Sequence, residues 1–161
     1  MKKLVFTLLG AVFCLLASAQ TRSYADNASG TFVFGLESYF YGRSGTLDFK
    51  ADGKTFQASI EGGQVSVGGA VLEEGSGEVV VGVHDFSGNR VPDLMVARRD
   101  GSQVSASIYQ LSSGRWALMG STGAVEGSEI RVFRQVISVR KDDVLRSWTW
   151  HNGHFDYKSN R

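Results

Sequence analysis

Short turn dipeptides divide this chain into hairpins, and they restrict the possible fold more than any other feature of the sequence. Asp52-Gly53, Asp100-Gly101 and Asn152-Gly153 are each the pair preferred in a two-residue β-hairpin turn, because these residue types tolerate a positive φ. A fourth turn is expected at Ser113-Gly114. Between the turns, apolar and polar residues alternate, and no window of a dozen residues has a convincing helical period. The sequence therefore predicts antiparallel hairpins.

Pairing residues outward from each turn tests this prediction, since the apolar side chains of a half-buried hairpin must share one face. The facing pairs expected are Phe49–Phe56, Leu47–Ala58, Ala97–Val104, Met95–Ala106, Leu111–Trp116 and Tyr109–Leu118. Further strands are expected at 65–72, 79–83 and 130–139, the last with a bulge near Phe133. The acidic, glycine-rich segment 73–78 is expected to be a solvated loop. The predicted class is all-β, with roughly nine to eleven antiparallel strands.

The first residues have the organisation of a secretory signal peptide. Lys2 and Lys3 precede an apolar run over 4–16, and small residues follow at 17–19. The run is too short to span a bilayer as a stable helix, so no transmembrane segment is expected in the mature chain. We expect an exported bacterial protein, periplasmic or extracellular. Its expected parts are a signal peptide over 1–19, a flexible lead-in over 20–30 and a single all-β domain over 31–161.

Composition and motifs limit the classes of function. The chain has 17 Lys plus Arg and 16 Asp plus Glu. Because these charges nearly balance, we expect no large positively charged surface that could bind nucleic acid. Its single cysteine, Cys14, lies in the expected signal peptide, so the mature domain must be stabilised by its core, a metal or a partner. No Gly-x-Ser-x-Gly or other nucleophile motif is present. We therefore expect that the protein is not an enzyme.

The segment after the expected strand at 79–83 carries oxygen-bearing residues at alternate positions. They are Asp85, Ser87, Asn89 and Asp93, at relative positions 1, 3, 5 and 9, and the carbonyl of Val91 fills position 7. Alternate side chains of a curled loop can point inward around one hard cation, and calcium takes six to eight oxygens. The pattern predicts a structural calcium site. The alternative is a metal-free turn in which Asp85 and Asn89 accept hydrogen bonds from backbone amides.

The sequence VGVHDFSGNRVPDLMVA, residues 81–97, resembles the FG-GAP and VCBS-type repeat, whose calcium loop has the form D-x-[DN]-G-D-G-x-x-D. The matching residues are Asp85, Ser87, Asn89 and Asp93 at the ligand positions and Gly88 and Pro92 at the turn positions. Arg90 stands where the repeat has a glycine with positive φ, and only two ligands are charged, which implies weak binding. Because one repeat cannot build a propeller, the resemblance implies a compact sandwich or partial propeller-like module. Such a module would bind a protein or a cell-envelope component.

The C-terminal hairpin is a second candidate site. Pairing across Asn152-Gly153 places His151 opposite His154, with Asp156 one step along the strand. These three residues could ligate a transition metal, or they could form an ordinary solvent-facing polar side. The opposite face gathers the aromatic residues Trp148, Trp150, Phe155 and Tyr157. They are expected to be core, or alternatively the sugar-stacking platform of a carbohydrate-binding or hydrolytic envelope protein.

Two turns containing Ser-Gly pairs, at 41–45 and 112–116, suggest a third class of function. In outline they resemble the protruding loops of small periplasmic inhibitor or immunity-type proteins, lysozyme inhibitors included, that block a cell-wall hydrolase. Arg43 or Arg115 could then reach acidic catalytic residues of the target, with Trp116 at the contact. The alternative is that both segments are ordinary hairpin tips.

Overall fold

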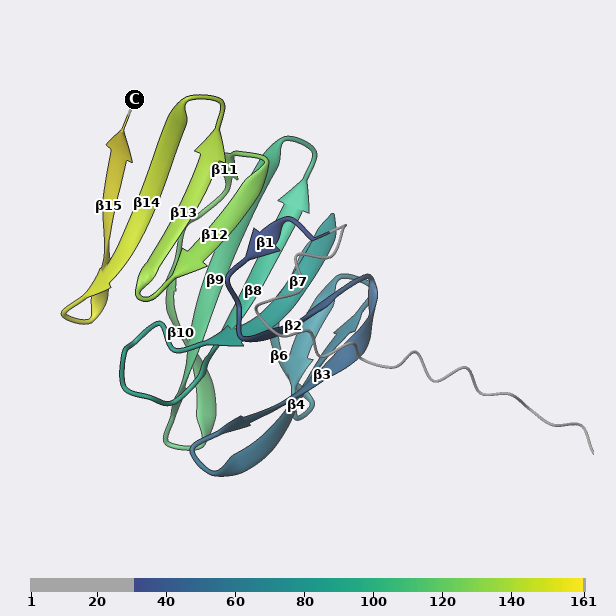
Figure 1. The fold of residues 1–161 in the computed structure, drawn as a ribbon. Helices are drawn as coiled ribbons and strands as arrows, with labels where there is room; N and C mark the ends of the chain where they lie inside the picture. Colours follow the sequence, from purple (N-terminus) through teal and green to yellow (C-terminus); the bar gives the residue numbers. More distant parts are fainter. Residues whose placement is uncertain (1–30, 161) are drawn as a thin grey trace, which may run out of the picture.

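The computed structural model of the chain describes residues 31–160, which form strands joined by short connections (Figure 1). The expected signal peptide over 1–19 and lead-in over 20–30 lie outside these residues. The described strands are β1 (Val33–Phe34), β2 (Ser38–Tyr41), β3 (Ser44–Ala51), β4 (Lys54–Glu61), β5 (Gln64–Val67), β6 (Ala70–Glu74), β7 (Glu78–His84), β8 (Asp93–Asp100), β9 (Gln103–Ser112), β10 (Arg115–Ser121), β11 (Val125–Glu126), β12 (Glu129–Phe133), β13 (Val136–Lys141), β14 (Val144–His151) and β15 (His154–Asn160). The all-β class is confirmed, although the strands outnumber the roughly nine to eleven expected.

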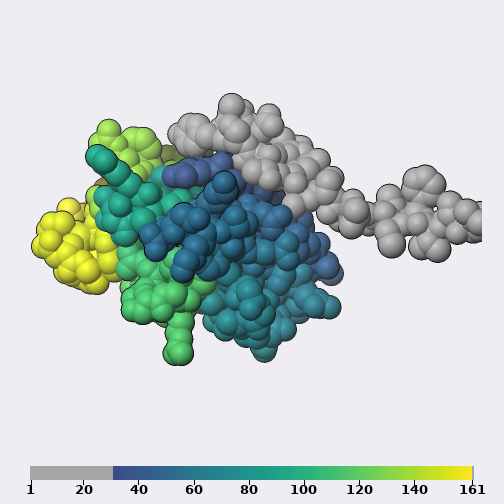
Figure 2. Space-filling model, turned by 90° about the horizontal axis from the view of Figure 1, so that it is seen from below, coloured from purple at the N-terminus to yellow at the C-terminus, as the bar shows by residue number. Residues whose placement is uncertain are grey.

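The described strands form three sheets. The central sheet has the order β10-β9-β8-β7-β2, with β11 paired to β9. The C-terminal sheet has the order β1-β12-β13-β14-β15, and the N-terminal sheet has the order β3-β4-β5-β6. Among these strands β1 and β12 run parallel, and the other pairs are antiparallel. The yellow C-terminal strands and the blue β3–β4 region lie toward opposite sides of the molecule (Figure 2).

The central sheet is buried on both faces, which makes the fold a compact sandwich of sheets. On β7, Val80 packs into a first core together with residues of the C-terminal sheet, whereas Val81 packs into a second core together with the N-terminal sheet. On β8, Met95 and Leu94 divide between the two cores in the same way. Burial on both faces explains why the apolar residues of 79–83 form a continuous run instead of alternating with polar ones.

Three of the four predicted turns form with the predicted register. The pairs around Asp52-Gly53, Ser113-Gly114 and Asn152-Gly153 are those expected from the sequence. In each turn both central residues have a positive φ, for example 49° at Asp52 and 70° at Gly53. A type I′ turn requires this conformation, because its twist matches that of the flanking strands. Local residue preferences are therefore sufficient to place these hairpins.

The hairpin between β8 and β9 differs from the prediction. Ala97 pairs with Ala106 rather than with Val104, because the turn consists of Gly101 and Ser102. Gly101 has a φ of 58° and Ser102 is not among the residues with positive φ, which is the glycine-first pattern of a two-residue turn. The predicted pairs Ala97–Val104 and Met95–Ala106 are therefore wrong. Each partner moves by two residues, so the apolar residues still share one face.

Two segments predicted as single strands are hairpins. Residues 65–72 turn at Gly68-Gly69, which have φ values of 56° and 84°. Residues 130–139 turn at Arg134-Gln135, where Arg134 has a φ of 53°, so the predicted bulge near Phe133 is wrong. Neither Gly nor Asn marks that second turn. The predicted solvated loop at 73–78 is also wrong, because only 75–77 lie between β6 and β7.

Candidate functional site

The loop over residues 85–92 connects β7 to β8 and curls around the carboxylate of Asp85. Oδ1 of Asp85 accepts hydrogen bonds from the backbone amides of Gly88 and Asn89, at 2.7 and 3.1 Å. Oδ2 of Asp85 accepts one from the amide of Arg90 at 2.8 Å. These bonds hold the loop closed through its own residues, as the metal-free alternative anticipates.

Arg90 has a φ of 68° and therefore adopts the left-handed conformation. The FG-GAP and VCBS-type repeat has a glycine at this position. A non-glycine residue in this conformation costs about 1–2 kcal/mol. The hydrogen bond from its amide to Asp85 offsets part of that cost. The arginine therefore keeps the backbone shape that a glycine would supply, at some expense of stability.

Asp93, the first residue of β8, is buried with 1% of its surface exposed. Its Oδ2 accepts a hydrogen bond from the amide of Ser87 at 2.8 Å, whereas its Oδ1 has no partner among the described residues. Burial raises the pKa of Asp93 above its ordinary value, and the hydrogen bonds from Ser87 act in the opposite direction. A buried carboxylate oxygen without a partner is costly, so this atom is where a cation would be stabilising.

The oxygens of the loop suit a hard cation in their chemistry. Besides the free Oδ1 of Asp93, Oδ2 of Asp85 and Oδ1 of Asn89 each accept one backbone hydrogen bond, and such oxygens can accept a second interaction. Within residues 31–160 no group of three or more His, Cys, Asp or Glu side chains is arranged to hold a metal. A cation here would therefore depend on the neutral oxygens of Ser87, Asn89 and Val91 in addition to the two carboxylates.

The loop is attached to the C-terminal sheet by two residues that the sequence analysis did not identify. Nε2 of Gln135 donates to the carbonyl oxygen of Ser87 at 3.2 Å, and Nε2 of His84 lies 2.7 Å from the carbonyl oxygen of Arg134. Both contacts involve the β12–β13 turn. Because the sequence predicted a continuous strand there, no signal pointed to this attachment.

The C-terminal hairpin brings together the three residues of the second candidate site. His151 pairs with His154, as predicted. Nε2 of His154 lies 2.9 Å from one carboxylate oxygen of Asp156, and Nδ1 of His151 lies 3.8 Å from the other. Both imidazoles are exposed. The carboxylate thus lies near both rings, but these three side chains are not arranged to hold a metal together. A metal at this place stays a prediction that the geometry does not favour.

The aromatic residues on the opposite face of this hairpin divide between core and surface. Trp148 is 6% exposed and belongs to the first core, so its predicted burial is confirmed. Trp150 is half-buried, with its ring centroid 5.0 Å from that of Phe155. The ring of Tyr157 lies tilted against Trp148, with the centroids 5.2 Å apart, and the residue is 54% exposed, so its predicted place in the core is wrong. A sugar platform would therefore have to use Tyr157 and the accessible part of Trp150.

The turns proposed as inhibitory loops present different side chains. Arg115 is exposed at the β9–β10 turn, and Arg43 is exposed between β2 and β3. Trp116 instead packs edge-on against Phe49 and Phe56, with ring centroids 5.5 and 5.3 Å away. Trp116 therefore contributes to the second core, and the two arginines are the side chains available to a partner.

The candidate residues are distributed over separate parts of the fold: the β7–β8 loop, the β14–β15 hairpin and two turns at 41–45 and 112–116. None of the described residues forms a helix with the length and apolar character needed to cross a membrane. Comparison of the chain with protein-family models, with curated proteins and with solved structures finds no match.

Proposed function

We propose that this protein is an exported, non-enzymatic binding module in which the β7–β8 loop takes a structural calcium ion. The observation that carries the proposal is the buried Oδ1 of Asp93, which has no partner among the described residues. An ionised carboxylate buried without a full set of partners destabilises the fold. A cation bound beside Asp93 would remove this destabilisation.

The residues that would hold the ion are those of the oxygen pattern, Asp85, Ser87, Asn89, Val91 and Asp93. Calcium would supply a positive charge that offsets the two carboxylates, and the neutral oxygens would complete its coordination. With only two charged ligands and Arg90 nearby, we expect a dissociation constant in the range of about 10⁻⁴–10⁻³ M, as in extracellular modules. Because Asp85 already holds the loop curled, the ion would add stability to an existing loop.

The binding role is proposed from the sequence. The sequence contains no nucleophile motif, and the resemblance to FG-GAP and VCBS-type repeats favours a module that contacts a protein or a cell-envelope component. The loop is tied to the C-terminal sheet through Gln135, so an ion in the loop would stabilise the packing of two sheets. We therefore expect calcium to raise the stability of the whole domain.

The test is a thermal denaturation of the protein, first with a chelator and then with increasing calcium or magnesium. Ligand linkage predicts about 2.7 kcal/mol of stabilisation at a hundredfold excess over the dissociation constant. In chelator, Asp93→Asn should be as stable as the wild type or more so, because a neutral amide replaces a buried charge. The same variant should gain nothing from calcium.

The matched control is Asp48→Asn, which alters an exposed carboxylate on β3 outside every candidate metal site and should keep the full calcium response. Magnesium should act more weakly, since it requires near-octahedral geometry. Because the expected dissociation constant is about 10⁻⁴–10⁻³ M, the calcium titration extends to about 100 mM at constant ionic strength. No stabilisation over that range, or an equal response in Asp93→Asn, would contradict the proposal and favour the metal-free turn.

A further inference from the structure

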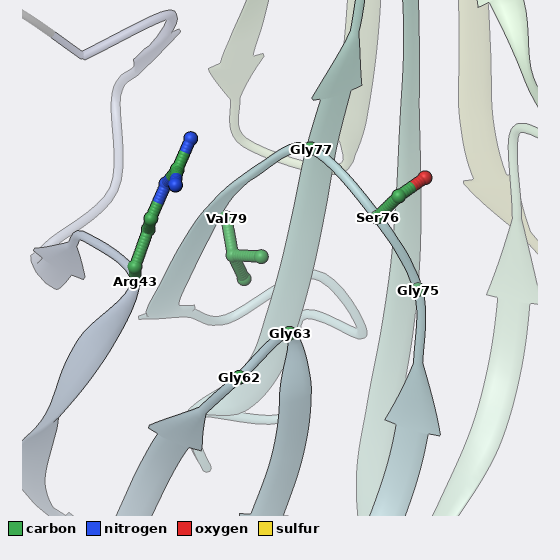
Figure 3. Close-up of a pocket in the computed structure, with 7 residues that line it drawn as sticks. All are labelled: Arg43, Gly62, Gly63, Gly75, Ser76, Gly77 and Val79. Carbon is green, nitrogen blue, oxygen red and sulfur yellow. The ribbon is translucent and has the colours of Figure 1, made fainter.

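A pocket of about 320 Å³ lies where three connections of the chain meet, away from the calcium loop (Figure 3). Arg43 comes from the β2–β3 connection, Gly62 and Gly63 form the β4–β5 turn, and 75–77 connect β6 to β7. Val79 lies between these segments, and the side chain of Ser76 points away from the pocket. The volume is at the lower end of the range for ligand-binding pockets, so it suits one small group.

Four of the seven residues that line this pocket are glycines, and several of their backbone amides have no partner among the described residues. Within residues 31–160, no hydrogen bond is donated by the amides of Gly62, Gly63, Ser76 or Gly77. Gly62 and Gly63 have φ values of 57° and 88°, so both are in the left-handed conformation. Successive free amides in turns form concavities that bind anions.

Two carbonyl oxygens of the same segments, those of Gly63 and Gly75, already accept hydrogen bonds. The guanidinium of Arg98 donates to the carbonyls of Gly63 and Gly75, at 2.8 and 3.1 Å. The amide of Gly75 also donates to the carbonyl of Gly63. With these carbonyls engaged and the amides free, the polarity of the pocket favours a negatively charged group.

Arg43 adds a positive charge beside these amides. Its side chain is exposed, and it takes part in no ion pair within the described part of the chain. Glu78 is the carboxylate close enough to interact with Arg43, but it is bound by Arg99 at 2.5 Å and by the hydroxyl of Tyr41. Arg43 is therefore available to an incoming anion.

We propose that this pocket binds the carboxylate of an acidic side chain presented by a partner protein. The guanidinium of Arg43 would form a forked pair of hydrogen bonds with the carboxylate, the geometry that arginine and carboxylate share. The free amides of the Gly62-Gly63 turn and of the 75–77 connection would donate to the same group. A single arginine balances a single negative charge, and Glu78 nearby disfavours a doubly charged anion such as phosphate.

The test is a titration of isotope-labelled protein, followed through the NMR amide resonances of Gly62, Gly63, Ser76 and Gly77. The probe is acetyl-glutamate N-methylamide, and its neutral isostere acetyl-glutamine N-methylamide is the control ligand. The glutamate probe should shift the four resonances saturably, and the glutamine probe should not. Equal shifts with both probes, no shift with either, or stronger saturable shifts with inorganic phosphate at matched ionic strength would overturn the proposal.

Two matched variants distinguish binding at the pocket from non-specific attraction between charges. Arg43→Gln should weaken binding of the glutamate probe by about tenfold or more, the effect expected for the loss of a charge-assisted hydrogen-bonding partner. Arg115→Gln removes an equally exposed arginine from the β9–β10 turn and should leave the affinity unchanged. Resonances outside the pocket report whether each variant remains folded. A folded Arg43→Gln variant that binds the glutamate probe like the wild type would overturn the assignment. The assay contains no calcium, so its result does not depend on whether the β7–β8 loop binds calcium.

Discussion

Nε of Arg98 on β8 donates to the carboxylate of Glu73 on β6 at 2.7 Å, and this ion pair joins the central sheet to the N-terminal sheet. The two side chains are only 11% and 18% exposed. The hydroxyl of Tyr109 on β9 donates to the second carboxylate oxygen of Glu73 at 2.9 Å. Burial and the negative charge of Glu73 raise the pKa of Tyr109, so this hydroxyl stays protonated and able to donate.

This arrangement predicts a large loss of stability for Arg98→Ala. The substitution leaves the carboxylate of Glu73 without its cation and removes the guanidinium donor from the carbonyls of Gly63 and Gly75, of which only that of Gly63 keeps a backbone donor among the described residues. Breaking a buried pair in this way costs about 3–5 kcal/mol, and the partial exposure of this pair places it at the lower end. Urea denaturation measures the loss. Arg131→Ala, which removes an exposed partner of Glu129, should cost less than about 1 kcal/mol, and similar losses for both would contradict the burial argument.

A second prediction concerns the aromatic face of the C-terminal hairpin. Trp148→Ala removes a buried side chain from the first core and should cost about 3–5 kcal/mol, whereas Tyr157→Ala removes a ring that is 54% exposed and should cost much less. Denaturation curves give both values. If the Tyr157 variant is the less stable one, the ring contributes more to packing than its exposure indicates.

The turns show how far the sequence determines this fold. Asn152-Gly153 and Asp52-Gly53 satisfy the type I′ requirement locally, so their hairpins could be placed residue by residue. The turn at Arg134-Gln135 contains no such pair, and its carbonyls bond to His84 and to the amide of Trp150, which lie outside the hairpin. A turn imposed by tertiary packing leaves no local signal in the sequence.

The candidate calcium loop could likewise be predicted only in part. The alternate spacing from Asp85 to Asn89 predicted a curled loop, and the backbone hydrogen bonds that Asp85 and Asn89 accept are those of the metal-free alternative. The burial of Asp93, which is 1% exposed, is not revealed by alternation within a single hairpin. The contact from Gln135 also joins residues far apart in the sequence.

A third prediction uses the pH dependence of stability at Glu78. Hydrogen bonds from Arg99 and Tyr41 lower the pKa of this carboxyl. A lowered pKa in the folded state adds stability above the unfolded pKa of about 4.3, and this stability is lost as the pH falls through the folded value. Glu78→Gln should therefore melt below the wild type at pH 7, and the difference should narrow in acid below about pH 4. Melting curves across this range provide the measurement, and a pH-independent difference would show that packing, not charge, is responsible.

A fourth prediction compares two glycines that share a left-handed backbone but differ in their surroundings. A Cβ added at Gly53, with a φ of 70°, would meet nothing within 4 Å, whereas one at Gly63, with a φ of 88°, would lie 2.3 Å from the carbonyl oxygen of Gly75. Gly53→Ala should thus cost only the conformational strain, about 1–2 kcal/mol. Gly63→Ala should cost distinctly more, because backbone must move to relieve the clash. Parallel urea denaturations measure the difference. Equal losses would mean that the β6–β7 connection moves freely, and it would then be too loose to hold the amides of the Arg43 pocket in a binding arrangement.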